Sequence, residues 1–156
     1  MTEPAIKHEY RPIERLGHLA ERLTHRPYRA DDYATAHAWW MKYNRGHLEQ
    51  KHLSPFGLVV EDTEPIAMGW LYMSNADITQ LGWVVTNPDV GPKRKMAALL
   101  RLFIVAEEFV RSYGFTSIQM MSDSPVLSKV SQWLGWQKLR PHDFMLKSLS
   151  EDDDDV

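Results

Sequence analysis

Residues 84–100 have the sequence VVTNPDVGPKRKMAALL, and this stretch decides the fold. Its first residues end an apolar strand predicted over residues 78–86, and Asn87 and Pro88 mark the turn that follows. Beyond the turn, apolar residues recur at three- and four-residue steps, which is typical of a helix that buries one face: Met96, Leu99, Leu100, Phe103, Ala106, Val110 and Tyr113. The sequence therefore predicts a strand, a turn that carries three cations, and a long helix packed on a sheet.

The residues on either side of this stretch divide into further strands and helices. Short apolar runs between polar or proline-containing turns predict more strands: one around Tyr28, residues 57–61, 66–73 and 117–121, and a last strand or hairpin over residues 137–149 around Pro141. Helical spacing of apolar residues predicts three more helices, over residues 12–23, 33–43 and 125–134. This order predicts a mixed sheet with helices on both faces.

The composition is that of a folded domain without thiol chemistry. The chain has 156 residues, enough for one domain with a core, and its 44% hydrophobic content is too high for a disordered protein. It has no cysteine, which excludes a disulfide, a thiolate nucleophile and a cysteine-ligated metal. The seven histidines form no HExxH or comparable ligand set, so we expect no metal site.

The chain lacks the sequence features of a secreted or membrane protein. Its opening residues, MTEPAIKHEYRPIERL, contain no apolar run, and no stretch approaches the roughly 18 apolar residues of a membrane span. We therefore expect a cytoplasmic location and no membrane partner. A net charge of -3 makes nucleic-acid binding an unlikely function, although Lys93, Arg94 and Lys95 form a local basic cluster.

Three segments are expected along the chain. Residues 1–26 form an N-terminal helical extension, residues 27–149 form the main domain, and residues 150–156 form an acidic tail. Like charges repel and the tail has almost nothing apolar to bury, so we expect it to stay solvated.

Three local patterns within residues 27–149 point to one family. Residues 84–100 place Pro88 and the pair Leu99 and Leu100 at a fixed spacing, and residues 113–118, YGFTSI, pass from the long helix to the next strand. Residues 124–136, SPVLSKVSQWLGW, end in a Leu-Gly-aromatic pattern. Together these patterns resemble the GNAT superfamily of N-acetyltransferases, and the segments around Trp39, residues 69–72 and residues 83–88 look most like small GNAT proteins of phages and bacteria.

The resemblance implies a mixed α/β fold with a mostly antiparallel central sheet of about six to seven strands. It also implies acetyl-CoA as the cofactor, bound by residues of the strand over residues 78–86, the basic turn and the start of the last helix: Val84, Val85, Thr86, Gly91, Lys93, Arg94, Lys95, Met96 and Ser124. The turn departs from the family's glycine-rich pattern, with Gly91, Pro92, Arg94 and Met96 at its characteristic positions. A basic turn that is only solvated is the alternative for the cations, and a helix N-cap is the alternative or additional role of Ser124.

The implied chemistry is direct attack of an amine on the acetyl thioester. Ser131 occupies the position where many family members carry a tyrosine that protonates the leaving thiolate, and a serine hydroxyl is a poorer donor. Asp77, Gln80 and Tyr72 are the candidate base or donor groups near the central strand, with His142 as another, although each also has a structural interpretation. His47 and His52 would line the acceptor cleft in this fold.

Two functions follow from the resemblance. The first is an N-acetyltransferase that moves an acetyl group from acetyl-CoA to a primary amine whose identity the sequence does not specify. The second is a catalytically weakened GNAT-fold binding or assembly protein, which could be encoded by a phage. A homodimer is compatible with both.

Overall fold

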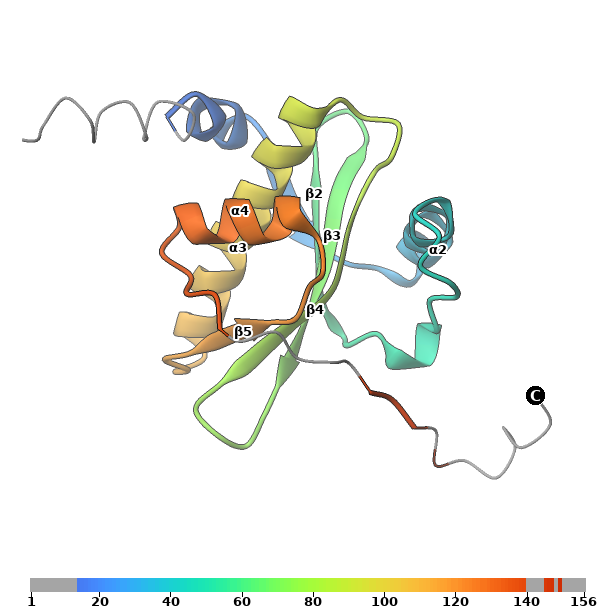
Figure 1. The fold of residues 1–156 in the computed structure, drawn as a ribbon, viewed down its shortest axis with the longest axis vertical. Helices are drawn as coiled ribbons and strands as arrows, with labels where there is room; N and C mark the ends of the chain where they lie inside the picture. The colour runs from blue at the N-terminus through green and yellow to red at the C-terminus, as the bar shows by residue number, and fades with distance from the viewer. Residues whose placement is uncertain (1–13, 140–144, 148, 150–156) are drawn as a thin grey trace, which may run out of the picture.

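The computed structural model describes residues 14–139, 145–147 and 149, and its strands form one five-stranded sheet (Figure 1). The order is β1-β2-β3-β4-β5, with every pair antiparallel except the parallel pair β4 and β5. The bounds are β1 Thr24–Pro27, β2 Phe56–Glu61, β3 Pro65–Met73, β4 Thr79–Thr86 and β5 Ile118–Met120. A mixed, mostly antiparallel sheet is confirmed.

The predicted count of six to seven strands is not matched. The described residues of the segment 137–149 form no strand, and Pro141 lies outside the described residues. The brief strand predicted around Tyr28 is β1, which ends at Pro27 and pairs Thr24 with Glu61 and Pro27 with Leu58. The sheet thus begins inside the segment assigned to the N-terminal extension.

Helices cover both faces of the sheet. Helix α2, Tyr33–Lys42, lies on one face, while α3, Pro92–Ser112, and α4, Pro125–Trp133, lie on the other (Figure 1). Residues 14–21 are also helical, and two short 3-10 helices, η1 at Ala30–Asp32 and η2 at Gln50–His52, flank α2 and its following loop. No helix in the described part of the chain is long and apolar enough to span a membrane.

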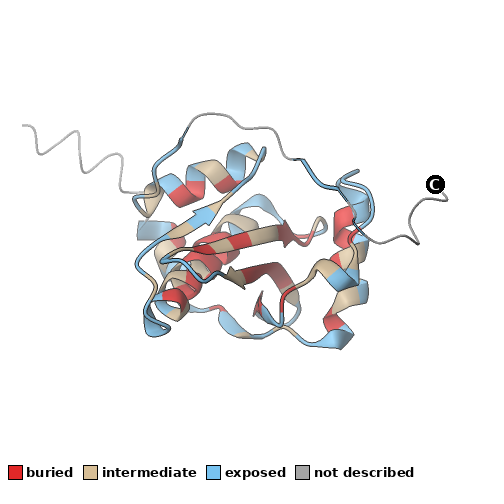
Figure 2. Ribbon diagram, turned by 90° about the horizontal axis from the view of Figure 1, so that it is seen from below, coloured by how far each residue is buried: buried red, intermediate tan, exposed pale blue. Residues whose placement is uncertain are grey.

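Strand alternation divides the core into two clusters. Leu58 and Val60 of β2 face the cluster under α3 and α4, while Val59 faces the cluster under α2, where Trp39 and Trp40 are buried. Figure 2 shows the buried residues concentrated on the sheet and on the inner sides of the helices. The helix over residues 14–21 also belongs to the first cluster through Leu16 and Ala20, so this segment packs against the domain.

A β-bulge interrupts the pairing of β3 with β4. Met68 pairs with Val85 but Trp70 pairs with Gly82, so Trp83 and Val84 lie opposite the single residue Gly69. Trp83 has φ 56°, a left-handed conformation that is uncommon for a side chain of this size. Such bulges bend a strand and redirect its side chains, and this one lies where β4 leaves β5.

Candidate functional site

Strand β4 continues beyond the end of its parallel neighbour. The two strands pair only at Thr79 with Ile118, Gln80 with Gln119 and Leu81 with Met120. From Gly82 to Thr86 no described residue of β5 pairs with β4, because the chain turns toward α4 after Met120. The backbone N–H and C=O groups that Val84, Val85 and Thr86 present on this edge are therefore available to a ligand.

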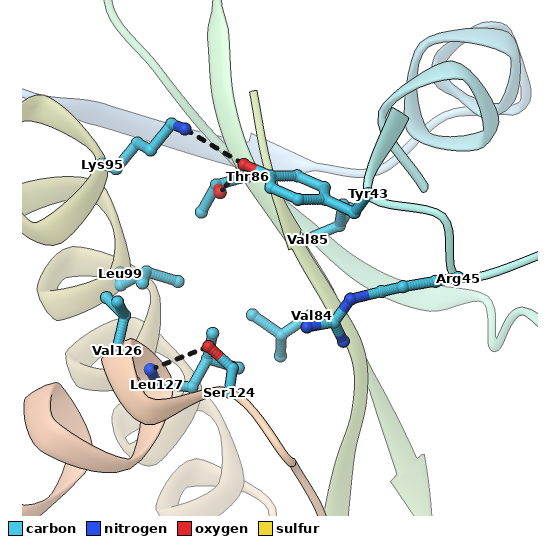
Figure 3. A pocket seen from close by; sticks show the side chains of 10 residues that line it. All are labelled: Tyr43, Arg45, Val84, Val85, Thr86, Lys95, Leu99, Ser124, Val126 and Leu127. Atoms are coloured by element: carbon cyan, nitrogen blue, oxygen red, sulfur yellow. Dashed lines mark hydrogen bonds between the residues drawn. The ribbon is translucent and has the colours of Figure 1, made fainter. Parts of the chain in front are cut away.

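A cavity of about 180 Å³ lies along the free edge of β4 (Figure 3). Its base is formed by β4, one wall by the first turns of α3 and α4, and the other wall by the loop that follows α2. The lining residues are Tyr43, Arg45, Val84, Val85, Thr86, Lys95, Leu99, Ser124, Val126 and Leu127. The cavity thus combines an apolar interior with a few polar groups, which is the usual composition of a small-molecule site.

Three polar side chains meet at the end of the cavity nearest the N-terminus of α3. The Lys95 ammonium donates to the Tyr43 hydroxyl at 3.1 Å and to the Pro88 carbonyl at 3.4 Å. The Tyr43 hydroxyl also lies 2.9 Å from the Thr86 hydroxyl oxygen, as Figure 3 shows. These contacts hold the cation of Lys95 at the cavity wall.

Arg45 lies at the other end of the cavity, near Val84 and Ser124 (Figure 3). Its guanidinium stacks over the Trp40 ring at 5.4 Å from the ring centre, and its carbonyl accepts a 3.1 Å hydrogen bond from the Trp40 indole. The guanidinium also pairs at 3.6 Å with Asp123, which lies in the loop before α4. Arg45 therefore connects the two walls across the free edge of β4.

The N-terminus of α3 is open next to this cavity. Gly91 is its N-cap residue without a side-chain cap, Pro92 has no N–H, and the first backbone bond into the helix is made by Lys95 to the Gly91 carbonyl at 3.1 Å. The N–H groups of Lys93 and Arg94 therefore have no partner within the helix. Such an end favours anions through its free donors and the helix dipole.

The structure brings together five of the nine residues predicted to bind the cofactor. Val84, Val85, Thr86, Lys95 and Ser124 line the cavity. Ser124 is also the N-cap of α4, where its hydroxyl accepts a 3.4 Å hydrogen bond from an N–H of the first turn. Both roles proposed for Ser124 are thus compatible with its position.

The other four residues of that set do not line the cavity. Gly91 and Lys93 are exposed at the end of α3, and Met96 packs against the core under α3 and α4. Arg94 extends to the turn between β2 and β3, where it pairs with Asp62 at 2.6 Å and Glu64 at 3.7 Å. Its charge is therefore neutralised away from the cavity.

None of the candidate catalytic residues in the described part of the chain lines the cavity, although Tyr72 and Gln80 lie opposite each other in the β3–β4 pair. Asp77 lies in the turn between β3 and β4 and accepts hydrogen bonds from the N–H of Thr116, at 2.7 Å, and from the Thr116 hydroxyl, which lower its pKa. The rise of β4 places Thr79, next to this turn, roughly 23 Å from Thr86. Gln80 is paired within the sheet at the same end of β4.

Tyr72 and Ser131 are both engaged in structural hydrogen bonds. The Tyr72 hydroxyl donates to the His52 carbonyl at 2.6 Å, and burial raises the Tyr72 pKa to about 12. The Ser131 hydroxyl is buried and donates at 3.0 Å to the Ser128 carbonyl of its own helix. His142 lies outside the described residues.

Two cavity residues, Tyr43 and Arg45, were not predicted from the sequence. They follow the end of α2, where Asn44 and Gly46 have positive φ angles of 54° and 81° and turn the chain back along the sheet. The sequence signal was the break of the helical pattern at this point. His47 and His52, predicted to line a cleft, lie farther along the same loop; His47 contacts His37 at 2.8 Å and His52 stacks on Trp83.

No described group of three or more His, Cys, Asp or Glu side chains could hold a metal ion.

No protein-family model matches the sequence, and no curated protein matches it significantly. Several solved structures share its fold. An aminoglycoside N-acetyltransferase AAC(6')-Iy in complex with CoA is 16% identical with a TM-score of 0.57, over 80% of this chain and 94% of that chain. The ribosomal-protein-S18-alanine N-acetyltransferase of Escherichia coli is 12% identical with a TM-score of 0.54, over 76% and 79%.

A third similar structure is described as a transcriptional regulator, from Bacillus halodurans C-125. It is 16% identical with a TM-score of 0.57, over 80% of this chain and 99% of that chain. At such identities the likeness concerns the fold, and function has to be argued from the site. The sequence patterns, the sheet order and these structures agree that the chain has the fold of the GNAT N-acetyltransferases.

Proposed function

We propose that the protein transfers an acetyl group from acetyl-CoA to a primary amine. The observation that carries this proposal is the cavity along the unpaired edge of β4, with the open N-terminus of α3 at one end. One likeness also supports it, because the AAC(6')-Iy structure contains CoA.

The residues at the cavity fit an acyl-CoA. The backbone groups of Val84, Val85 and Thr86 can hydrogen-bond the amides of the pantetheine arm, and the side chains of Leu99, Val126 and Leu127 can pack against its apolar parts. The free N–H groups of Lys93 and Arg94, together with the ammonium of Lys95, can donate hydrogen bonds to the phosphates of the acyl-CoA. The acetyl thioester supplies an activated acyl carbon.

The chain's contribution to the reaction is mainly positioning. The amine nitrogen forms a bond to the acyl carbon, the carbon–sulfur bond breaks, and the sulfur leaves as the thiol after taking up the proton that the amine releases. The bulge at Trp83 and Val84 redirects the strand edge where the acyl group would lie, so fixed backbone donors can stabilise the developing oxyanion. No carboxylate is among the described residues that line the cavity, so we propose that water carries the proton.

Calorimetric titration with acetyl-CoA tests the proposal with a matched pair of variants. Lys95→Met removes a cation from the cavity wall, whereas Arg94→Met removes the neighbouring cation that pairs with Asp62 and Glu64. We expect Lys95→Met to weaken binding roughly 10-fold or more and Arg94→Met by less than about 3-fold.

A second probe blocks the cavity itself. Val126 is 44% exposed and lines the cavity, so Val126→Trp should fill the space without disturbing the core, and Val126→Ala is its control. Loss of acetyl-CoA binding in the tryptophan variant alone would support the site. No binding by the wild-type protein at millimolar acetyl-CoA would refute the proposed function.

A binding or assembly protein is the second candidate. It is favoured by Ser131, whose hydroxyl is held within its own helix, and by a group of exposed apolar side chains after α4: Leu139, Met145, Leu146 and Leu149. These side chains would be buried if two copies associate. Light scattering on the wild type and on Met145→Ser/Leu146→Ser distinguishes a dimer from a monomer.

A further inference from the structure

The charged side chains that line the cavity are both cations. Lys95 belongs to the wall formed by α3, and Arg45 belongs to the opposite wall formed by the loop after α2. Asp123, which pairs with Arg45, is 91% exposed and is not among the lining residues. The cavity therefore offers positive charge to whatever enters it.

The two cations occupy different ends of the cavity. Lys95 lies with Tyr43 and Thr86, next to the open N-terminus of α3, where phosphates would bind. Arg45 lies by Val84, at the bulge, where β4 has just left β5. In the proposed function the acyl carbon lies at the bulge, and the amine must approach this carbon. Arg45 therefore lies near the incoming amine and away from the phosphates.

Arg45 is held in place, yet its anionic partner in the described part of the chain is weak. Stacking on Trp40 and the indole hydrogen bond to its carbonyl fix its backbone and guanidinium. Its ion pair with Asp123 is long, at 3.6 Å, and solvent-exposed, so this pair contributes little and a bound anion can replace it. A guanidinium can then form two parallel hydrogen bonds to a carboxylate.

We infer that the acceptor is an amine that also carries a carboxylate, and that Arg45 binds this carboxylate. This inference rests on the proposed acetyl transfer and names its substrate class. The same charge disfavours polycationic amines, because a second ammonium group would be placed near Arg45 with no lining carboxylate to balance it.

Matched acceptor pairs test the inference by release of free CoA thiol. L-leucine and 3-methylbutylamine differ only in the α-carboxylate, 6-aminohexanoate and pentylamine differ only in a distant carboxylate, and spermidine is the polycation. We expect wild-type kcat/KM to favour the carboxylate-bearing member of at least one pair by roughly 10-fold or more, with spermidine the poorest acceptor.

Two variants locate the preference. Arg45→Gln should raise KM for the favoured amino acid roughly 10-fold or more while leaving the matched simple amine nearly unchanged. Lys42→Gln is the control, because Lys42 is an exposed cation three positions away that pairs with Asp89 and does not line the cavity. We expect this control to retain the wild-type preference.

A binding measurement gives a readout that does not depend on turnover. With CoA present, tryptophan fluorescence should report tighter binding of N-acetyl-leucine than of N-(3-methylbutyl)acetamide, and Arg45→Gln should remove the difference. Equal binding of the two, preference for spermidine, or equal losses for both acceptors in Arg45→Gln would overturn the inference while acetyl-CoA binding stands. Absence of acetyl-CoA binding in the wild type would instead overturn the proposed function and this inference with it.

Discussion

The placement of α2, which carries Tyr43 and Arg45 to the cavity, depends on a charged cluster at its N-terminal side. Asp32 accepts two 2.8 Å hydrogen bonds from the Arg26 guanidinium and one from the N–H of Arg29. Arg26 also pairs with Glu61 of β2 at 3.1 Å, so the cluster joins β1, β2 and the start of α2. We predict that Asp32→Asn destabilises the fold.

The size of this destabilisation follows from how deeply the ion pair is buried and from the Glu61 partner that Arg26 keeps. Removing one partner of a fully buried ion pair costs about 3–5 kcal/mol. The side chains of Arg26 and Asp32 are 22% and 11% exposed, and Arg26 keeps Glu61, so we expect a lower cost of about 2 kcal/mol. With an unfolding entropy of roughly 0.33 kcal/mol/K for 156 residues, Tm should fall by about 6 °C.

The destabilisation caused by Asp32→Asn should also depend on pH. The hydrogen bonds from Arg26 lower the pKa of Asp32 in the folded protein below its ordinary value of about 4. The stabilisation is therefore complete above the unfolded pKa and is lost as pH falls through the folded pKa. The stability difference between wild type and Asp32→Asn should be large at pH 7 and should shrink below about pH 4.

Urea unfolding at pH 7 and at pH 3 measures both quantities. Asp31→Asn is the matched control, because Asp31 is the neighbouring carboxylate and is exposed. Two results would refute this account of the cluster. One is a free energy of unfolding of Asp32→Asn within about 0.5 kcal/mol of wild type at pH 7, and the other is a difference in that free energy that persists unchanged at pH 3.

Three further predictions concern packing and the cavity. Gly57→Ala should cost about 3 kcal/mol in urea unfolding, because its Cβ would lie 2.5 Å from the Tyr28 Cβ and 2.6 Å from the buried Trp70 ring. Ser124→Ala should cost about 0.5 kcal/mol, since the N-cap bond that it loses is long, at 3.4 Å; a loss above about 2 kcal/mol would contradict a simple cap. Tyr43→Phe should weaken acetyl-CoA binding in calorimetry about 3-fold by releasing Lys95, and unchanged affinity would show that Lys95 needs no such support.

Local sequence patterns predict those helices and strand ends whose signal lies within the element itself. Helix α3 was expected because its apolar spacing persists over about five turns, and α4 because Pro125 and Gly135 bracket its apolar residues. The end of β4 at Thr86 was expected because Asn87 and Pro88 mark a turn. In each case the information lies within a few residues of the element.

Features that depend on distant contacts could not be predicted in this way. Asp77 is a carboxylate and therefore a possible base. It instead accepts a hydrogen bond from the N–H of Thr116, which is 39 positions away, and this contact makes its role structural. Arg45 lies at the cavity because the loop after α2 turns back along the sheet at Asn44 and Gly46 and so brings Arg45 to the same cavity as Val84 of β4. The last predicted strand has apolar residues at 145 and 146, yet their described backbone does not pair with the sheet.

The basic cluster at residues 93–95 shows how packing divides one sequence motif into different roles. In sequence, Lys93, Arg94 and Lys95 are three equivalent cations at the mouth of a helix. Successive helical residues point about 100° apart, so the three cannot face one ligand together. Arg94 is paired at 2.6 Å with Asp62, while Lys95 lies against the Tyr43 hydroxyl at the cavity wall.

This division bears on the departures from the glycine-rich family pattern. Pro92 removes one donor from the helix end, and Arg94 places a side chain where glycine would let a phosphate approach closely. Because Arg94 is drawn toward Asp62 and Glu64, its side chain leaves the approach to the free N–H groups of Lys93 and Arg94 open. Breaking those ion pairs with Asp62→Asn/Glu64→Gln should therefore allow Arg94 to fold back, which would change acetyl-CoA affinity although neither substituted residue lines the cavity.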